Sequence, residues 1–289
     1  MKTLLQLMRV REWVKNLFVF LPLVFGGGLL SGPGLLNAII AFVCFSLTAS
    51  SIYILNDLND RASDSQHPLK RSRPLAAGRV STDLAGGICA ALACAALATS
   101  RIFLSPLPTY ILAAYLALNV LYTYWLKQLP IIDVMTIATG FVLRVLCGGA
   151  ACHIWVSPWL VAMVFLLTLF IAFGKRRDDL LRIQTDNKAL RRSAAAYSLN
   201  FIDQVMALLA GAMIVAYLIY TLSPDVEARF GSHYVYTTTI FVIAGILRYM
   251  QIAMVNKESG DPTGIVYRDP FLTGCCVLWL ASFIAIIYV

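Results

Sequence analysis

The sequence predicts an all-α integral membrane protein with about nine transmembrane helices and a cytoplasmic N-terminus. Composition is the first observation behind this class: 60% of the residues are hydrophobic and only 13% are charged, whereas a soluble domain carries roughly 25% charged residues. The mean hydropathy of +0.77 points in the same direction. A chain this apolar could not keep its surface hydrated in water, so we expect the bilayer to be its solvent.

The second observation is a series of apolar segments. A helix needs about 20 apolar residues to cross a hydrocarbon core of roughly 30 Å. The segments are 17–31, 36–55, 84–100, 107–126, 131–152, 157–173, 204–222, 234–254 and 271–289. The first is the weakest, because Pro22 and three consecutive glycines interrupt it. The seven cysteines fall in or beside these segments, where we interpret them as small hydrophobes, and the whole chain, 1–289, is then one transmembrane domain.

The third observation is the distribution of basic residues. With the N-terminus inside and the spans alternating, all but three of the 23 Lys and Arg residues lie on the cytoplasmic side. The exceptions are Arg101 and Arg229 outside and Arg144 within a span. The two long cytoplasmic loops, about 56–83 and 174–203, are then the sizeable polar segments of the chain. This asymmetry explains the net charge of +8 without a nucleic-acid partner.

The strongest local signal is the string NDLNDRASD at residues 56–64, where the second predicted span ends. Asp57, Asp60 and Asp64 are three and four residues apart, a spacing that stacks them on one face of a helix. Carboxylates stacked in this way repel one another unless a cation joins them, and Mg²⁺ prefers such hard oxygen ligands. Asn56 can add a neutral oxygen, so the string predicts a magnesium site.

Basic residues follow the acids directly. The string HPLKRSRPLAAG at residues 67–78 places Lys70, Arg71 and Arg73 just beyond the acidic cluster. Arginine offers a planar fork to phosphate oxygens, and a metal beside it neutralises the charge on a departing diphosphate. The pattern therefore predicts that a diphosphate binds together with Mg²⁺. The alternative is a solvated helix end whose acids pair with Arg61 and Lys70.

The combination NDxxDxxxD followed by KRxRPLAAG resembles the first Asp-rich motif of the UbiA superfamily of membrane prenyltransferases. Other strings are similar to its polyprenyl-phosphate (decaprenyl-phosphate) phosphoribosyltransferase branch: RVREWVKN (9–16), YTYWLKQLPIIDV (122–134), GFVLRVLCGGA (140–150), FGKRRDDL (173–180) and AYSLNFIDQ (196–204). The resemblance covers most of residues 9–204. It implies a UbiA-like helical bundle with a polar cavity that opens to the cytoplasm.

For this branch the resemblance implies an enzyme that transfers 5-phosphoribose from 5-phosphoribose 1-diphosphate (PRPP) to a membrane polyprenyl phosphate. Diphosphate leaves, Mg²⁺ is the cofactor, and the lipid product leads to lipid-linked arabinofuranose for the cell envelope. The site would face the cytoplasm from the inner (plasma) membrane. The acceptor phosphate is already an anion at neutral pH, which accords with a sequence that shows no obvious Ser/His/Asp or Cys/His constellation.

Two anionic substrates held close together require many cations. The candidate substrate-binding residues are Lys15, Asn56, Lys70, Arg71, Arg73, Tyr122, Lys127, Arg144, Lys175 and Arg176. Topology alone could place most of the basic ones at inner helix ends. Arg144 has no such explanation, because a charge at membrane depth usually faces a cavity or a partner. Asp133, eleven residues earlier on the same predicted helix, would line that cavity with it, and the alternative is a structural ion pair with another acid.

The third cytoplasmic loop departs from the superfamily pattern. Its GKRRDDL string carries Asp178 and Asp179 where prenyltransferases have a second Asp-rich motif, DxxxD, that binds a second Mg²⁺. Asp179 stays a candidate metal ligand, because the phosphoribosyltransferase branch has an acid near this position.

Two other functions stay open. A UbiA prenyltransferase would move a prenyl group from its diphosphate to an aromatic acceptor and would use the same first motif. A non-catalytic lipid transporter would account for Arg144 and the broken first span, but not for the NDxxDxxxD string. The pairs Gly86-Gly87 and Gly148-Gly149 allow close packing of helices within the chain or between copies, so a homo-oligomer is also open.

Overall fold

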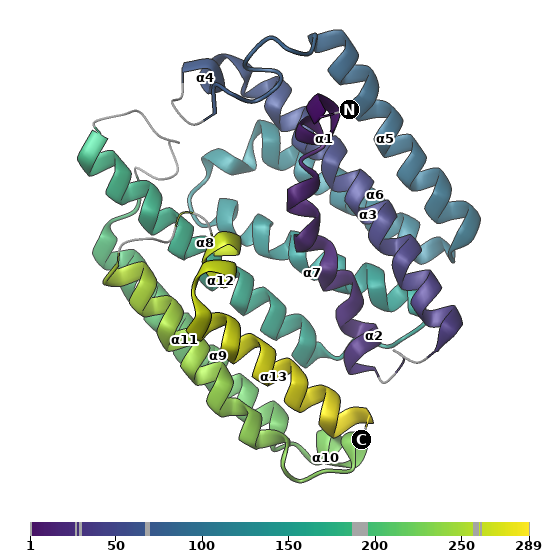
Figure 1. The fold of residues 1–289 in the computed structure, drawn as a ribbon, viewed down its shortest axis with the longest axis vertical. Coiled ribbons are helices and arrows are strands. Elements are labelled where there is room, and N and C mark those ends of the chain that lie inside the picture. The colour runs from purple at the N-terminus through teal and green to yellow at the C-terminus, as the bar shows by residue number, and fades with distance from the viewer. Residues whose placement is uncertain are drawn as a thin grey trace. The chain divides into compact units, whose positions relative to one another are not determined.

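The computed structural model describes residues 2–26, 28, 31–66, 70–186, 196–256, 260 and 262–288, which form helices joined by turns (Figure 1). These residues contain no β-strand, which confirms the all-α class. The chain divides into two compact units, Met1–Lys127 with Gly140–Val156, and Gln128–Thr139 with Ser157–Val289. Helix α7 (Ile132–Cys152) contributes residues to both.

The first unit is built on the long helix α3 (Gly32–Asn59), which packs mainly against α5 (Thr82–Phe103) and α6 (Pro106–Tyr124). Its shorter elements are α1 (Lys2–Leu7), the 3-10 helix η1 (Val10–Phe20), α2 (Leu21–Phe25), α4 (Arg61–Gln66) and η2 (Leu126–Gln128). Helix α3 begins where the Ser31 hydroxyl accepts a hydrogen bond from the Gly34 amide at 3.3 Å. Small buried residues along α3 let its neighbours approach closely.

The second unit packs α8 (Pro158–Asp186) against α9 (Leu199–Thr221), and α11 (Thr239–Met254) against α13 (Pro270–Tyr288). The remaining elements are α10 (Pro224–Phe230), the 3-10 helix η4 (Val235–Thr238) and α12 (Pro262–Arg268). The core of this unit is apolar, and Phe170, Ile202 and Met206 are at most 1% exposed. Because lipid is as apolar as these side chains, close packing rather than exclusion of water stabilises them inside a bilayer.

Within the described part of the chain, six helices are long and apolar enough to cross a membrane, judged by length and composition. They are Gly32–Asn59, Thr82–Phe103, Ile132–Cys152, Pro158–Leu181, Leu199–Thr221 and Val235–Met254. Each coincides with one of the predicted apolar segments. The predicted segment 107–126 falls on α6, and 271–289 falls on a shorter apolar helix, Pro270–Ile286. Nine spans and a cytoplasmic N-terminus stay predictions.

The predicted first span, 17–31, differs from the structure. Residues 10–20 form η1, and α2 ends at Phe25, so no single helix covers the described part of this segment. Pro22 lies in the first turn of α2 and Gly26 closes it. Proline removes a backbone donor and glycine relaxes the chain, so the residues that interrupt the hydropathy also divide the helix.

Within the first unit, η1 and α7 approach backbone to backbone at Gly148. A Cβ added to Gly148 would lie 1.8 Å from the carbonyl oxygen of Val19. By contrast, a Cβ added to Gly87 on α5 would meet nothing within 4 Å. The two glycine pairs of the sequence therefore differ, because Gly148 is a packing contact and Gly87 faces open space.

Gly148→Ala should lower the thermal unfolding midpoint of the detergent-solubilised protein, because η1 must move to accept the methyl group. We expect a loss of about 1–3 kcal/mol, the usual effect of overpacking. Gly87→Ala is the matched control and should leave the midpoint unchanged or slightly higher, because alanine restricts the unfolded chain. Equal midpoints for the two variants, compared by scanning fluorimetry, would contradict the backbone contact at Gly148.

Candidate active site

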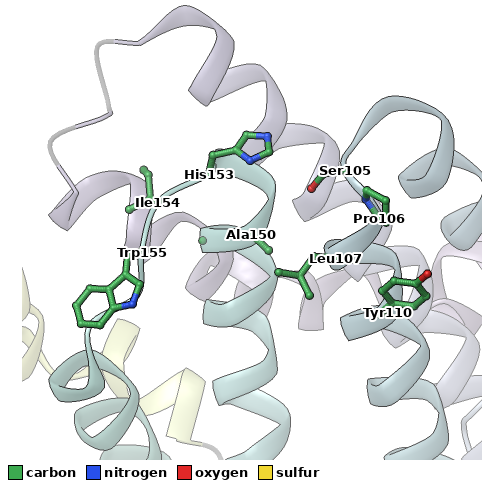
Figure 2. Close-up of a pocket in the computed structure, with 9 residues that line it drawn as sticks. Ser105, Pro106, Leu107, Tyr110, Ala150, His153, Ile154 and Trp155 are labelled. Atoms are coloured by element: carbon green, nitrogen blue, oxygen red, sulfur yellow. The ribbon is translucent and has the colours of Figure 1, made fainter.

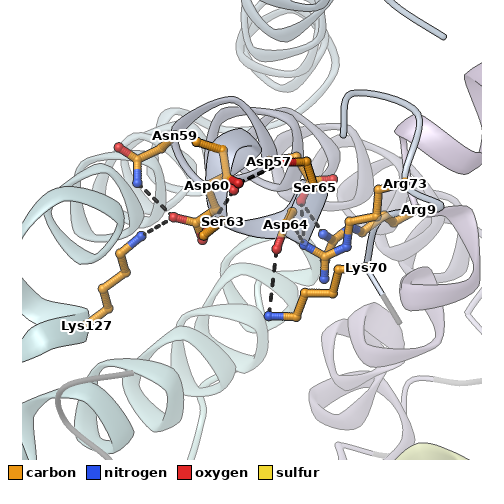
Figure 3. Close-up of polar contacts among 11 residues, drawn as sticks. Arg9, Asp57, Asn59, Asp60, Ser63, Asp64, Ser65, Lys70, Arg73 and Lys127 are labelled. Carbon is orange, nitrogen blue, oxygen red and sulfur yellow. Dashed lines mark hydrogen bonds and ion pairs between the residues drawn. The ribbon is translucent and has the colours of Figure 1, made fainter. Parts of the chain in front are cut away.

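Buried acids and bases meet where α3 ends (Figure 3). Asp57 and Asp64 are each 3% exposed, and both accept hydrogen bonds from one nitrogen, Nη1 of Arg73, which lies 3.1 Å from Asp57 Oδ1. Lys70 Nζ lies 3.8 Å from Asp64 Oδ1. Arg9 Nη2 donates to Asp57 Oδ1. Buried carboxylates need such partners, because an unpaired ion away from water strongly destabilises a fold.

Asp60 turns to a different partner. The structure ends α3 at Asn59 and begins α4 at Arg61, so Asp60 lies between two helices. Its carboxylate accepts hydrogen bonds from Lys127 Nζ at 2.7 Å and from Asn59 Nδ2 at 2.9 Å (Figure 3). The prediction that the three acids stack on one face of a helix is therefore wrong. The break separates Asp60 from the two acids that share Arg73 and brings it to Lys127.

Arg9 belongs to this cluster, although it is not among the predicted site residues. Besides its bond to Asp57, its guanidinium carbon lies 5.1 Å from the centroid of the Tyr53 ring. Arg9 precedes Asp57 by 48 residues, so no local spacing predicts the pair, although Arg9 begins the RVREWVKN string. Of the other predicted bases, Arg71 is exposed. His67 lies outside the described residues.

The donor set at the end of α3 suits a hard cation such as Mg²⁺. Asp57 and Asp64 already converge on one cationic nitrogen. Asn56 Oδ1 is buried and has no hydrogen-bond partner in the described structure, and an orphaned acceptor of this kind suits an ion. In the same described residues, no three acidic, His or Cys side chains form a closed metal cage. Mg²⁺ needs none, because it usually binds one or two carboxylates together with substrate phosphates.

Two further candidates, Lys15 and Tyr122, lie on other elements of the first unit. Lys15 pairs with Glu12, three residues earlier on η1. Burial opposes the charge of Lys15, but Tyr53 and Glu12 together raise its pKa, so the ammonium keeps its proton. Tyr122 is half-buried in the last turn of α6.

Arg144 has neutral partners. Its Nε donates to Asn16 Oδ1 at 2.8 Å, and its Nη1 donates to the Gly140 carbonyl at 2.7 Å. Its Nη2 donates to the Tyr115 hydroxyl at 3.1 Å, and three aromatic rings have centroids within 5.0 Å of the guanidinium carbon. Asp133, which the sequence places near Arg144, has its own basic partner in the second unit. The contacts of Arg144 thus favour a structural role, although not the predicted ion pair.

A second cluster of buried charges lies in the second unit. Arg176 and Asp133 are 2% and 0% exposed. Arg176 Nε donates to Asp133 Oδ2 at 2.9 Å, and Nη1 donates to Asp179 Oδ2 at 2.9 Å. The Tyr197 hydroxyl donates to Asp133 Oδ1 at 3.2 Å, and burial raises the pKa of Tyr197, so the hydroxyl keeps its proton. Lys175, the neighbour of Arg176, is exposed.

Arg177 is a buried base that is not among the predicted site residues. Its Nε donates to Asp203 Oδ1 at 2.7 Å, and its Nη1 donates to the Ala253 carbonyl at 2.8 Å. These bonds tie α8 to α9 and α11, which is a structural task. The GKRRDDL string contains both arginines, and nothing in the string separates the two roles.

An apolar cavity of about 550 Å³ lies in the first unit between the start of α6 and the end of α7 (Figure 2). Its lining is Ser105, Pro106, Leu107, Tyr110, Gly149, Ala150, His153, Ile154 and Trp155. This lining carries no acid and no Lys or Arg. A diphosphate needs charged partners, so the cluster at the end of α3 is the better candidate site.

The fold and the clusters together define an integral membrane protein with paired acids and bases at the end of an apolar helix. The chain belongs to the UbiA prenyltransferase family, whose model matches residues 19–288. It is similar to the decaprenyl-phosphate phosphoribosyltransferases of Mycolicibacterium smegmatis (33% identical over 99% of this chain and 92% of the relative) and Mycobacterium tuberculosis (32%, over 95% and 90%). The family and these relatives make the chain a transferase.

The solved structures agree on the fold. A UbiA homolog from Archaeoglobus fulgidus bound to GPP and Mg²⁺ matches with a TM-score of 0.75. The match covers 99% of this chain and 100% of that chain at 19% identity. This likeness supports the UbiA arrangement of the helices.

Arg144→Lys should destabilise the protein, because an ammonium cannot reproduce three divergent bonds from a planar guanidinium. We expect a loss of about 1–3 kcal/mol, since buried neutral partners would be left unsatisfied. The measurement is the thermal midpoint in detergent, with Arg101→Lys at the exposed end of α5 as the control. A midpoint for Arg144→Lys equal to that of the control would show that the three bonds do not support the fold.

Proposed function

We propose that this chain transfers 5-phosphoribose from PRPP to a membrane polyprenyl phosphate and releases diphosphate. The observation that carries the proposal is a cluster at the end of α3. It joins two buried carboxylates to three bases, namely Asp57 and Asp64 with Arg9, Lys70 and Arg73. Such a group suits a cation and a diphosphate held together. Similarity over nearly the whole chain to two decaprenyl-phosphate phosphoribosyltransferases supports this choice of reaction.

In this proposal the acidic residues help diphosphate to leave the donor. Asn56, Asp57 and Asp64 would hold Mg²⁺, and Asp60 keeps Lys127 at the same helix end. When bound, the ion neutralises the charge that develops as diphosphate leaves the anomeric carbon. The fixed carboxylates also stabilise the cationic sugar that forms as that bond breaks.

The bases hold the anions. Lys70, Arg71 and Arg73 would contact the diphosphate of the donor, because a guanidinium matches two phosphate oxygens at once. The other proposed contacts are Lys15, Tyr122, Lys127, Lys175 and Arg176. Asp179, which accepts a hydrogen bond from Arg176, is a further candidate metal ligand.

No general base is required in this reaction. A polyprenyl phosphate is already an anion at neutral pH, so its oxygen can attack without losing a proton to the protein. The task of the side chains is to orient the two substrates and to balance their charge. In this proposal Arg144 supports the fold through its three neutral partners.

In this proposal the reaction takes place at the cytoplasmic face of the inner (plasma) membrane. The six apolar helices of the described residues support a membrane location. The gathering of Lys and Arg in alternate loops supports the orientation. The lipid product would then serve synthesis of lipid-linked arabinofuranose.

A second candidate function is prenyl transfer from a prenyl diphosphate to an aromatic acceptor. The Archaeoglobus fulgidus homolog bound to GPP and Mg²⁺ favours it, because the folds are alike. Both reactions need a metal-bearing diphosphate, so the cluster at the end of α3 fits either one. The choice of donor separates them.

Purified protein in detergent should move label from radiolabelled PRPP into an organic-soluble polyprenyl phosphate in the presence of Mg²⁺. EDTA should abolish the transfer, and Asp57→Asn should lower kcat by about 100-fold or more, because a charge that stabilises the transition state is lost. Asp83→Asn, an exposed acid in the first turn of α5, is the control and should retain activity. The readout is lipid-borne label over time.

Two outcomes would decide against this function. Protein that leaves the lipid unlabelled but prenylates an aromatic acid would promote the second candidate. Transfer that survives both EDTA and Asp57→Asn would remove the metal and the acid from the mechanism.

A further inference from the structure

One tyrosine contacts both a strained turn and a buried acid in the second unit. Ile131, just before α7, has a φ of 68°, in the left-handed region that β-branched residues rarely adopt. Its amide donates a hydrogen bond to the Tyr197 hydroxyl. Two residues on, the Asp133 carboxylate accepts a hydrogen bond from the same hydroxyl at 3.2 Å.

We propose that Tyr197 is a positioning residue for Arg176 and acts through Ile131 and Asp133. The inference rests on the proposed function, in which Arg176 is one of the substrate contacts. Asp133 Oδ2 accepts from Arg176 Nε at 2.9 Å while Asp133 Oδ1 accepts from Tyr197. The acid therefore lies between the tyrosine and the arginine, and Tyr197 itself touches no substrate.

The two carboxylates define the plane of the guanidinium. Asp133 accepts from Nε of Arg176 and Asp179 accepts from Nη1, each at 2.9 Å. A planar group bonded at two nitrogens cannot rotate without losing one of these bonds. Asp179 lies three residues along the same helix, whereas Asp133 ties Arg176 to α7. The orientation of Arg176 relative to α7 thus depends on where Asp133 lies.

The ring of Tyr197 is held independently of the turn. It is 8% exposed and stacks on Phe201 at 5.9 Å with an interplanar angle of 12°. It also meets Phe173 edge-on at 6.0 Å. Ser198 caps α9 by accepting from the Phe201 amide, which keeps this segment in place. Loss of the hydroxyl alone would therefore release the turn while the ring stays packed.

Two hydrogen bonds hold the strained turn: the Ile131 amide donates to that hydroxyl, and the Asp133 amide donates to the Leu129 carbonyl at 3.0 Å. A left-handed β-branched residue persists only where its surroundings hold it. The Tyr197 hydroxyl provides the acceptor for the Ile131 amide, and without it the turn relaxes toward negative φ. Because Asp133 follows two residues later, relaxation shifts its carboxylate away from Arg176.

Tyr197→Phe tests the inference in the full-length protein in detergent. We expect the KM for PRPP and the Kd for inorganic diphosphate each to rise about tenfold, with kcat within about twofold. Tyr217→Phe is the matched control, because its similarly buried hydroxyl accepts from Trp279 Nε1 and bonds Thr238, each at 2.7 Å. This control should change neither constant. Wild-type values of both constants for Tyr197→Phe would overturn the inference.

Ile131→Gly distinguishes positioning from a merely structural role. Glycine adopts the left-handed region without strain, so the turn no longer needs the hydroxyl. Tyr197→Phe should then raise KM less in the Ile131→Gly background, about threefold rather than about tenfold. A rise as large in both backgrounds would overturn the role of the turn.

A measurement of diphosphate binding distinguishes failure of the proposed role of Tyr197 from failure of the proposed function. Suppose that the wild-type protein binds diphosphate but transfers no phosphoribose, and that Arg176→Gln abolishes diphosphate binding. This result would contradict the proposed function alone. The role of Tyr197 would still be decided by the Kd of Tyr197→Phe. Phosphoribosyl transfer with an unchanged KM in Tyr197→Phe would overturn the inference alone.

Discussion

Charges buried in this chain must be compensated by the protein, because neither lipid nor a packed helix interior offers them water. Asp57 and Asp64 are 3% exposed and share Arg73, which follows Asp64 by nine residues. The chain must therefore leave α3 and turn back within that distance. In the second unit, the same constraint brings Asp133 to Arg176. Helix ends and turns at both clusters thus follow from the need to pair charges.

The balance of charge at the end of α3 narrows the class of ligand. Arg9, Lys70 and Arg73 surround two acids, Asp57 and Asp64. A site built for a metal alone would be net negative, because its ligands must offset the ion. An excess of bases instead favours an anion that brings a metal with it, which is the form of a diphosphate with Mg²⁺. The proposed sugar donor is supported by similarity to the mycobacterial enzymes.

Apolar length is a local property, so hydropathy could predict the six helices that meet the criteria for a span. The acid–base association around NDLNDRASD could also be predicted, since its members are close in sequence. The pairs Arg9–Asp57 and Asp133–Arg176 could not, because they join residues 48 and 43 positions apart. Local spacing does not encode which distant base reaches a buried acid. The prediction that the three acids share one helix face was wrong for a related reason. Their spacing does not encode the end of α3 at Asn59.

The basic side chains of the two clusters differ in exposure to solvent, and this difference indicates different tasks. The side chains of Arg9, Arg73 and Lys70 are 22%, 26% and 38% exposed. Those of Arg176 and Asp133 are 3% and 0% exposed. Solvent and a phosphate can therefore reach the bases at the end of α3, whereas the buried Asp57 and Asp64 need a cationic partner throughout. Breaking a buried pair leaves an uncompensated charge and is strongly destabilising. The Arg176–Asp133 pair therefore keeps one geometry. The position of the Arg176 guanidinium then depends on the neighbours that hold Asp133 in place.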